Sequence, residues 1–315
     1  NFRRELNLAL NENKHFLPLY LEETELKFVL KLQISSFASL LKYNETPESY
    51  VKKLTQIIPS EVIESSLNKE ISVNLGGGVA IELVWVLPGT FKMGSPEREK
   101  DRSNDEKLHT VTITKGYWLG KYPVTQVQWK KVMGNKLSHF KKGDDYPVIV
   151  LWDDCQEFIN KLNDLVKKTN ALPQKSGAFR LPTEAEWEYG CRAGTQTRFY
   201  WGDDLDEKEI GDYCWYIANS NGSIHPVGQK KPNKFGLYDM SGNVCEWCSD
   251  WYGDYPADAV TDPVGPDSGS YRVLRGGGWD GHPRSCLSAI RYYYNPSGCY
   301  NYVGFRLALP SGHQG

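Results

Sequence analysis

The seven cysteines carry the most reactive side chains of this chain, and they stand at irregular intervals. An odd number leaves at least one thiol unpaired unless it pairs between chains, so a dense disulfide framework is not indicated. Cys245 and Cys248 have the C-x-x-C spacing of a zinc knuckle, but no second pair accompanies them. On an extended strand these two side chains would point to opposite faces, which argues against a shared metal ion.

Two further patterns near the C-terminus are compatible with binding chemistry. Gly276-x-Gly278-x-x-Gly281 matches the dinucleotide fingerprint formally, but it lacks the strand-to-helix context and the downstream acidic residue. His282 could contact a ligand or a metal, although a lone histidine is more often an ordinary polar contact. Local motifs alone therefore assign no catalytic residue.

The composition argues against several classes of function. The formal net charge of −2 provides no attractive field for nucleic acid or for an anionic membrane. No apolar run approaches the ~20 residues that a membrane-spanning helix needs, and no signal peptide is recognisable, although an address at the true N-terminus could have been removed. The 19 tyrosines and 10 tryptophans are unusual, because such amphipathic rings suit half-exposed binding surfaces.

Two domains are expected from the 315 residues. Residues 1–75 predict a helical N-terminal region, because the apolar stretch from Leu26 to Leu32 fits a buried helical stripe. The composition changes at Gly76-Gly77-Gly78, beyond which short strands, turns, Gly, Trp and Tyr dominate. We therefore expect a second domain over 76–315, with a spacer or docking role for the first.

Helices and short strands must together position any site in the second domain. Thr125 with Gln128, and Thr183 with Glu186, form capping-box patterns that each predict a helix start. Another helix with a buried face is expected from about Asp153. Strands are expected around Val84 to Leu87 and Val111 to Ile113, and no long helix is expected after residue 200.

Several segments resemble the formylglycine-generating-enzyme (sulfatase-modifying factor) superfamily and occur in family order between residues 80 and 310. Each alone is weak, but the ordered set is specific. The resemblance implies an α+β, C-type-lectin-like fold of the formylglycine-generating-enzyme type. The segments are Pro88-Gly-Thr-Phe-Lys-Met-Gly-Ser95, Lys121-Tyr-Pro-Val-Thr125, Arg180-Leu-Pro-Thr-Glu-Ala-Glu-Trp-Glu188, Phe235-Gly-Leu-Tyr-Asp-Met-Ser-Gly-Asn-Val-Cys-Glu-Trp247, Leu274-Arg-Gly-Gly-Gly-Trp279 and Val303-Gly-Phe-Arg306.

The enzymes of this superfamily oxidise a substrate cysteine with a copper-binding pair of cysteines, two and seven residues after the tryptophan of an RGGSW motif. Here Cys286 stands seven residues after Trp279, but the other position is Gly281. Soft thiolates suit Cu(I), and one sulfur of the pair is missing. Other relatives bind iron through three histidines in an N-terminal domain, where this chain has only His15. We therefore expect no enzyme activity.

Residues 280–302 contain no Lys, Glu, Gln, Met or Trp. None of these five types can be encoded by a codon that ends in a pyrimidine, whereas Tyr, Asp, His, Ser, Gly, Cys and Asn can. Randomising the first two bases of an Asn codon gives the observed set. The segment thereby resembles the variable region of proteins whose genes are diversified by diversity-generating retroelements. In those proteins the variable, Asn-codon-derived stretch lies between an RGGSW-like motif and a VGFRLA sequence.

The segment has the Tyr, Ser, Gly and Asn bias of antibody paratopes, in which Tyr gives a large, rigid contact area at little entropic cost. Flanking residues are expected to form a rigid frame, with Gly276 and Gly277 in turns, Trp279 as an anchor, and Arg291 and Arg306 in internal ion pairs. The predicted ligand-binding residues are Asp280, Gly281, His282, Arg284, Ser285, Ile290, Tyr292, Tyr293, Tyr294, Ser297, Gly298, Cys299, Tyr300, Asn301 and Tyr302. A stretch of this composition could also be plain strand surface or core, and Leu287 and Ile290 are expected to be partly buried.

A calcium site is also suggested by the resemblance, at positions that match Asp239, Gly242, Val244 and Glu246. Two carboxylates and backbone carbonyls are hard oxygen ligands that suit Ca²⁺. The alternative is that both acids only form hydrogen bonds to a loop. No cofactor is otherwise required.

These observations predict a non-catalytic receptor or adhesin on the cell surface, a location that rests on the resemblance alone. A protein ligand is favoured over a sugar, because the Glu-Pro-Asn and Gln-Pro-Asp triplets of sugar-binding lectins do not occur. No nucleic acid partner and no membrane-spanning segment are expected. The alternatives are an oxidoreductase of the formylglycine-generating class and a structural module without a ligand.

Overall fold

The computed structural model describes residues 19–24, 27–32, 70–134, 138, 141–173, 176–298 and 300–311. The chain divides into two compact units, Asn1–Lys69 and Glu70–Gly315. In the first unit, β1 (Leu19–Thr24) pairs with β2 (Lys27–Leu32) in antiparallel register, with Thr24 opposite Lys27.

The strand β2 corrects the expectation of a helix from Leu26 to Leu32. Phe28, Leu30 and Leu32 recur at every second position, which is the period of a strand. The neighbouring segment β1 can supply the pairing that a run of only six residues needs. The remainder of the expected helical region 1–75 lies outside the described residues.

The second unit begins at Glu70 rather than at Gly76. Strand β3 (Glu70–Gly76) pairs with β4 (Val79–Val86), so the glycine run is the turn of a hairpin within this unit. Gly76, Gly77 and Gly78 all have positive φ angles, of 85°, 67° and 79°. Only glycine adopts this left-handed backbone at little cost, which explains the composition at this turn.

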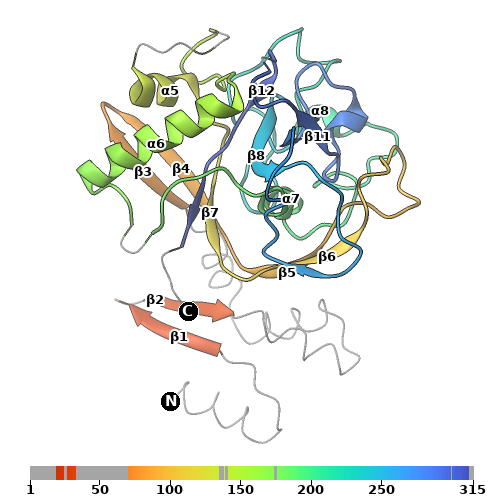
Figure 1. The fold of residues 1–315 in the computed structure, drawn as a ribbon, viewed down its shortest axis with the longest axis horizontal. Helices are drawn as coiled ribbons and strands as arrows, with labels where there is room; N and C mark the ends of the chain where they lie inside the picture. The colour runs from red at the N-terminus through yellow and green to blue at the C-terminus, as the bar shows by residue number, and fades with distance from the viewer. Residues whose placement is uncertain are drawn as a thin grey trace, which may run out of the picture. The chain divides into compact units, whose positions relative to one another are not determined.

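Three sheets form the frame of this unit (Figure 1). The first has the order β13-β7-β4-β3, with β7 at Tyr117–Gly120 and β13 at Ala308–Pro310. The second has the order β11-β10-β8-β12, and the third has the order β5-β6-β9. Their strands are β8 (Cys245–Trp251), β10 (Arg272–Arg275), β11 (Tyr292–Tyr294), β12 (Val303–Gly304), β5 (Gly89–Met93), β6 (His109–Ile113) and β9 (Val260–Thr261).

The three predicted helices are confirmed as α5 (Gln126–Met133), α6 (Trp152–Thr169) and α7 (Glu184–Arg192). Thr125 and Thr183 each accept a hydrogen bond from a backbone N–H of the first turn, and both capping boxes are complete. After residue 200 the described helical segments are short: α8 (Ile210–Tyr213) and the 3₁₀ turn η3 (Pro283–Cys286).

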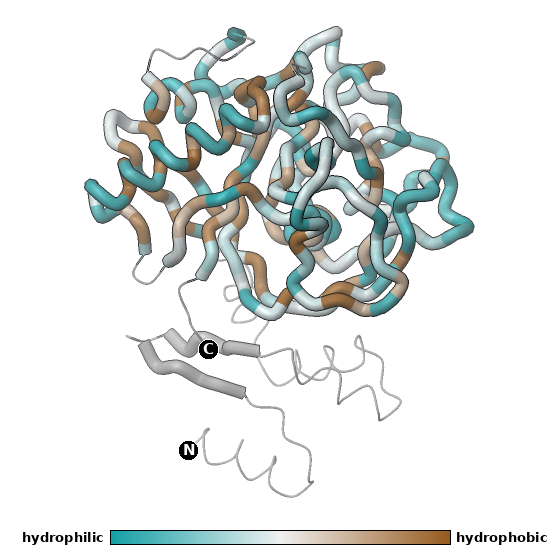
Figure 2. The backbone as a smooth tube through the Cα atoms, viewed as in Figure 1, coloured by the Kyte–Doolittle hydropathy of each residue, from teal (hydrophilic) through white to brown (hydrophobic). Residues whose placement is uncertain are grey.

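Two large apolar cores fill the unit. One lies under α5 and α6 and includes Trp129, Phe158 and Phe305, and hydrophobic and hydrophilic residues alternate along α6 accordingly (Figure 2). The other surrounds α7 and includes Trp187 and Leu237. Few helices combined with small sheets confirm the α+β, C-type-lectin-like fold predicted for this unit. None of the described helices is long and apolar enough to cross a membrane.

Candidate ligand-binding surface

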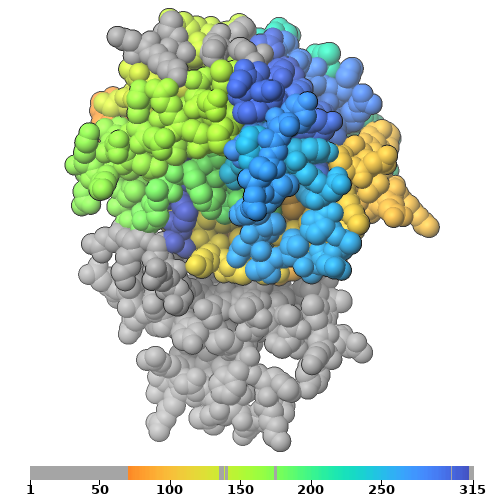
Figure 3. Space-filling view, viewed as in Figure 1, coloured from red at the N-terminus to blue at the C-terminus, as the bar shows by residue number. Residues whose placement is uncertain are grey.

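The predicted binding segment, residues 280–302, runs between β10 and β12 and contains η3 and β11. Figure 3 shows the C-terminal part of the chain, in blue, reaching the surface beside the yellow-green residues of α5 and α6. None of the predicted ligand-binding residues that the structure describes is buried. Those most exposed are His282, Arg284, Tyr293, Ser297 and Asn301; Cys299 lies outside the described residues.

Among the described residues of the segment, every buried position is one that was not predicted to bind. Cys286, Leu287, Ser288, Ala289 and Arg291 are each at most 5% exposed. Leu287 is completely buried, whereas Ile290 is half-buried and packs against the same small core. The segment therefore has a buried base and an accessible face.

Backbone carbonyls of the segment accept hydrogen bonds from residues that surround it. Ile217 N–H donates to the carbonyl of Gly281 at 3.0 Å, and Trp152 N–H donates to that of Pro296 at 3.2 Å. The hydroxyl of Ser241 donates to the carbonyl of Cys286 at 2.9 Å. Because every residue type has a backbone carbonyl, these bonds persist when side chains of the segment change.

Two buried arginines, Arg275 and Arg291, also hold the segment in place through ion pairs and hydrogen bonds to backbone carbonyls. Arg275 is fully buried, forms an ion pair with Glu188, and donates to the carbonyls of Ser288 at 3.1 Å and Ala289 at 2.6 Å. Arg291 pairs with Glu184 and also donates to the carbonyls of Asp105 and Gly253. The predicted internal pairing of Arg291 is therefore confirmed, as is that of Arg306, which binds Glu246.

Three half-buried tyrosines of the segment form one cluster, and all three also pack against the core that contains Trp129 and Phe158. The rings of Tyr294 and Tyr300 stack with centroids 4.1 Å apart, and Tyr302 meets Tyr294 edge-on at 6.2 Å. The hydroxyl oxygens of Tyr294 and Tyr302 lie 2.7 Å apart in a hydrogen bond. Burial and this hydrogen bond raise the pKa of Tyr302, so both phenols are neutral near pH 7. The cluster is a preassembled aromatic surface with polar tips.

A second tyrosine cluster lies around Tyr293, the central residue of β11. Its ring centroid is 4.1 Å from that of Tyr252 and 5.4 Å from that of Tyr271. Tyr271 and Tyr293 are both 45% exposed. The sequence did not predict Tyr252 or Tyr271 as site residues, because they lie outside the segment and only the overall richness in tyrosine hinted at them.

Tyr292 is half-buried and packs against the core, as Tyr294 does, whereas Tyr293 between them is exposed. Tyr292 packs against the cluster that contains Trp247 and Leu274, and burial raises its pKa to about 12. Its hydroxyl interacts with the side chain of Ser285, a second predicted site residue. Alternation along β11 therefore turns Tyr292 and Tyr294 to one side and Tyr293 to the other.

This chain has only one of the two cysteines that the resemblance matches to the copper-binding pair of the enzymes. Cys286 is fully buried, and Gly281 stands where the other cysteine would be. A Cβ atom at Gly281 would lie 2.9 Å from the Cβ of Ser285, so a side chain there would require a local shift. Cys245 and Cys248 belong to different cores, as the strand argument predicted.

The four residues matched to a calcium site lie together around the start of β8. Both carboxylate oxygens of Glu246 are bonded to Arg306, at 2.5 and 2.7 Å, and one of them also accepts from Trp187. Asp239 is 2% exposed and accepts from the Gly228 N–H at 2.7 Å. Burial raises the pKa of Asp239 to about 6. Asp239 and Glu246 each accept hydrogen bonds from within the domain, and Glu246 is also ion-paired with Arg306, so calcium binding here remains a prediction.

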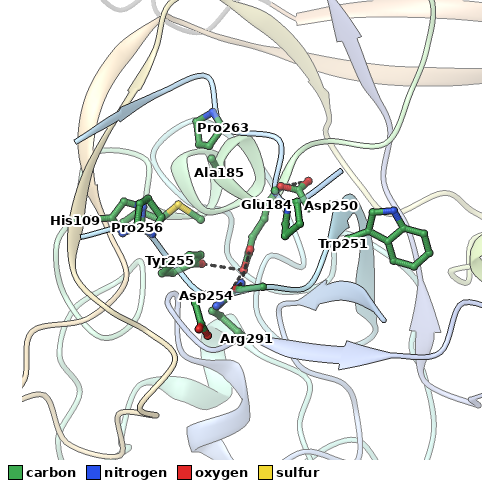
Figure 4. Close-up of a pocket in the computed structure, with 14 residues that line it drawn as sticks. His109, Glu184, Ala185, Asp250, Trp251, Asp254, Tyr255, Pro256, Pro263 and Arg291 are labelled. Atoms are coloured by element: carbon green, nitrogen blue, oxygen red, sulfur yellow. Dashed lines mark hydrogen bonds and ion pairs between the residues drawn. The ribbon is translucent and has the colours of Figure 1, made fainter. Parts of the chain in front are cut away.

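A small cavity lies beside Arg291, which is one of its lining residues (Figure 4). Its volume is about 60 Å³, and its lining includes Glu184, Asp250 and Tyr255. Tyr255 donates to Glu184 at 2.8 Å. Pockets for small-molecule substrates are several times larger, about 300 Å³ or more. The cavity therefore has room for water or a single small group, and the accessible tyrosine face remains the main candidate surface.

Comparisons with known proteins agree with this geometry. The family described as Sulfatase-modifying factor enzyme 1-like domain matches residues 78–310. The chain belongs to this family, which includes formylglycine-generating enzymes.

Treponema denticola variable protein 1 is similar in structure, with a TM-score of 0.67, 32% identity, and coverage of 76% of this chain and 98% of that chain. This similarity confirms the expected resemblance to variable proteins. The chaperone protein LppX of Paenibacillus barcinonensis is 33% identical over 241 residues, which are 64% of this chain and 79% of LppX. The formylglycine-generating enzyme of Mus musculus is 30% identical over 215 residues, 64% of this chain and only 53% of the enzyme. Relatives with such different names show that the fold alone does not define the function.

Proposed function

We propose that this chain is a non-catalytic, surface-displayed protein that binds varied ligands through residues 280–302, and that a retroelement diversifies this segment. The observation that carries the proposal is the way the segment is held. Its base is buried and its backbone carbonyls are bonded by Ile217, Ser241, Trp152 and Arg275, while its accessible side chains are of the types that Asn-derived codons encode. A binding surface that varies needs such separation of frame and contact residues.

Binding would use the two tyrosine clusters around Tyr293 and Tyr294. Each presents rigid rings that lose little conformational entropy on contact, and each phenol can donate or accept a hydrogen bond. The adjoining Ser297 and Asn301 are exposed and can adapt their hydrogen bonds to a partner. Exposed and half-buried aromatic rings, with only a small cavity found among the described residues, suit a protein ligand better than a small molecule.

Sequencing the 3′ end of the gene in many cells of one population tests diversification directly. We expect substitutions confined to the first two bases of codons within 280–302, with codons 274–279 and 303–308 unchanged. One invariant sequence across the population would remove the codon argument and with it the retroelement part of the proposal.

A display library tests whether the segment is a binding surface. The first library randomises the first two bases of Asn codons at exposed and half-buried positions such as His282, Tyr293 and Asn301, and selection is made against a panel of folded proteins. The matched control library applies the same randomisation to the buried positions Cys286 to Ala289 and to Arg291. We expect folded binders from the first library and few folded members in the second. Equal folding in both libraries, or no binder from a well-folded first library, would contradict the proposed division of the segment.

An enzyme of the formylglycine-generating class is the alternative function, favoured by membership in a family that includes such enzymes. The single thiol of Cys286 at the expected position argues against it. Copper-dependent conversion of a cysteine-containing peptide to an aldehyde, lost in Cys286→Ala, would establish the enzyme and replace the proposed non-catalytic role.

A further inference from the structure

Cys286 has a neighbour that the sequence did not suggest. Its side chain lies in a small core with the side chain of Cys214, together with Phe199, Ile210 and Leu287. Both cysteines are completely buried and both are free thiols. Cys214 follows α8, whereas Cys286 ends η3, so the two sulfurs come from segments far apart in the sequence.

Backbone contacts around two glycines support the proximity of the sulfurs. The N–H of Gly242 donates to the carbonyl of Gly276 at 2.7 Å, which joins the two glycine-containing turns. A Cβ atom at Gly242 would lie 2.5 Å from the sulfur of Cys214, and one at Gly277 would lie 3.2 Å from the sulfur of Cys286. The joined turns thus place one cysteine against each glycine, where no other side chain would fit.

The two thiols are also in electrostatic contact. Burial raises the pKa of the Cys214 thiol, and a hydrogen bond with the Cys286 thiol raises it further. Thiolate is the reactive form in disulfide exchange, so the Cys214 thiol is inert while the core is closed. Any chemistry between them must take place during folding or in a locally opened state.

We propose that Cys214 and Cys286 form a disulfide when the chain folds in an oxidising medium. One thiolate attacks a small-molecule disulfide such as oxidised glutathione and forms a mixed disulfide, releasing one glutathione. The second thiolate then displaces the other glutathione. Two S–H bonds are lost and one S–S bond forms, while the two electrons and two protons reduce glutathione disulfide to two glutathione molecules.

Such a bond would join the segment after α8 to the buried base of the predicted binding segment. Ile217 already donates to the carbonyl of Gly281, so the covalent link would reinforce a contact between the same two stretches. A crosslink between residues 214 and 286 closes a long loop, which restricts the unfolded chain. We expect the melting temperature of the oxidised protein to exceed that of the reduced protein by roughly 5 °C or more.

Mass spectrometry of the full chain tests the pairing. The protein is unfolded, reduced, refolded in a mixture of reduced and oxidised glutathione, alkylated in denaturant and digested. We expect a linked peptide pair containing Cys214 and Cys286, while Cys155, Cys191 and Cys248, which lie in other cores, are recovered alkylated. Recovery of both Cys214 and Cys286 as alkylated thiols would overturn the proposal.

Cys245 provides the strictest competitor, because it lies close enough to Cys286 for their charges to interact. A linked peptide of Cys245 with Cys286, or of Cys299 with either proposed partner, as the main product would also overturn the pairing. The variants Cys214→Ala and Cys286→Ala should each lose the dependence of the melting temperature on reductant. The matched control Cys191→Ala, at another fully buried thiol, should keep it. The mass-spectrometric result stands on the unchanged chain even if a variant does not fold.

Discussion

Arg291 binds both carboxylate oxygens of Glu184, with its Nε at 2.7 Å and its Nη2 at 2.9 Å. The arginine belongs to the predicted binding segment, whereas the glutamate begins α7 on the fixed part of the domain. Both side chains are at most 5% exposed. This bidentate pair fastens the segment to the helix from below, while Tyr292 to Tyr294 follow directly as β11.

Breaking this ion pair from one side should destabilise the domain strongly. Arg291→Met leaves the buried charge of Glu184 without its bidentate partner, and we expect a loss of about 3–5 kcal/mol in the free energy of unfolding. The double variant Arg291→Met with Glu184→Gln should recover part of that loss. Urea denaturation of the two single variants and the double variant measures this coupling. Fully additive losses would show that the pair does not act as a unit.

Neighbouring tyrosines of β11 should differ in their contributions to stability. Tyr293→Ser removes a ring that is 45% exposed, and we expect a loss below about 1 kcal/mol. Tyr292→Ser removes a ring that packs on the core and should cost about 2–3 kcal/mol. Thermal and urea unfolding of the two variants provides the comparison. Equal losses would mean that alternation along β11 does not separate contact from core positions.

The stability of the domain should depend on the titration of Asp250. Burial and the charge of Glu184 raise the pKa of Asp250 to about 7, whereas an unfolded carboxyl titrates near 3.8. Between these values the folded state holds a proton that the unfolded state has released, so this contribution to stability is lost as pH rises through about 7.

Asp250→Asn removes this titration and keeps an oxygen that can accept from the Glu184 N–H. Relative to the unchanged protein, the variant should gain stability at pH 8 compared with pH 4, by up to about 4 kcal/mol. Denaturation curves at a series of pH values give the difference between the two proteins. A difference that does not change with pH would exclude Asp250 as the titrating group.

Calcium binding, predicted from the resemblance, should be weak if it involves these residues. Asp239 would be the only charged ligand of the site, since Glu246 is ion-paired with Arg306, and few charged ligands give affinities on the order of 1 mM. We expect millimolar Ca²⁺ to raise the melting temperature and a chelator to reverse the rise. Asp239→Ala should abolish the response. An unchanged melting temperature at saturating Ca²⁺ would remove calcium from the description of this protein.

Local sequence determined the elements whose stabilising contacts are close along the chain. The capping boxes at Thr125 and Thr183 placed the starts of α5 and α7, because a cap and its partner are only three residues apart. The order of the family segments predicted the fold. The amino-acid composition of 280–302 marked a segment whose predicted binding residues, where the structure describes them, are exposed or half-buried. The spacing of Trp279, Gly281 and Cys286 showed that a glycine replaces one cysteine of the enzymes' pair.

Tertiary structure decided everything that depends on distant contacts. Tyr252 and Tyr271 join Tyr293, and Cys214 meets Cys286, through pairings of strands and turns that sequence spacing does not reveal. The apolar run in β2 forms a strand that pairs with β1. The carboxylate of Glu246 is ion-paired with Arg306, which lies 60 residues further along the chain, and the sequence did not reveal this pairing. Neighbouring residues determine helix and strand propensity and helix capping. Which side chains are buried, and which residues they contact, is determined only when segments distant in the sequence pack together.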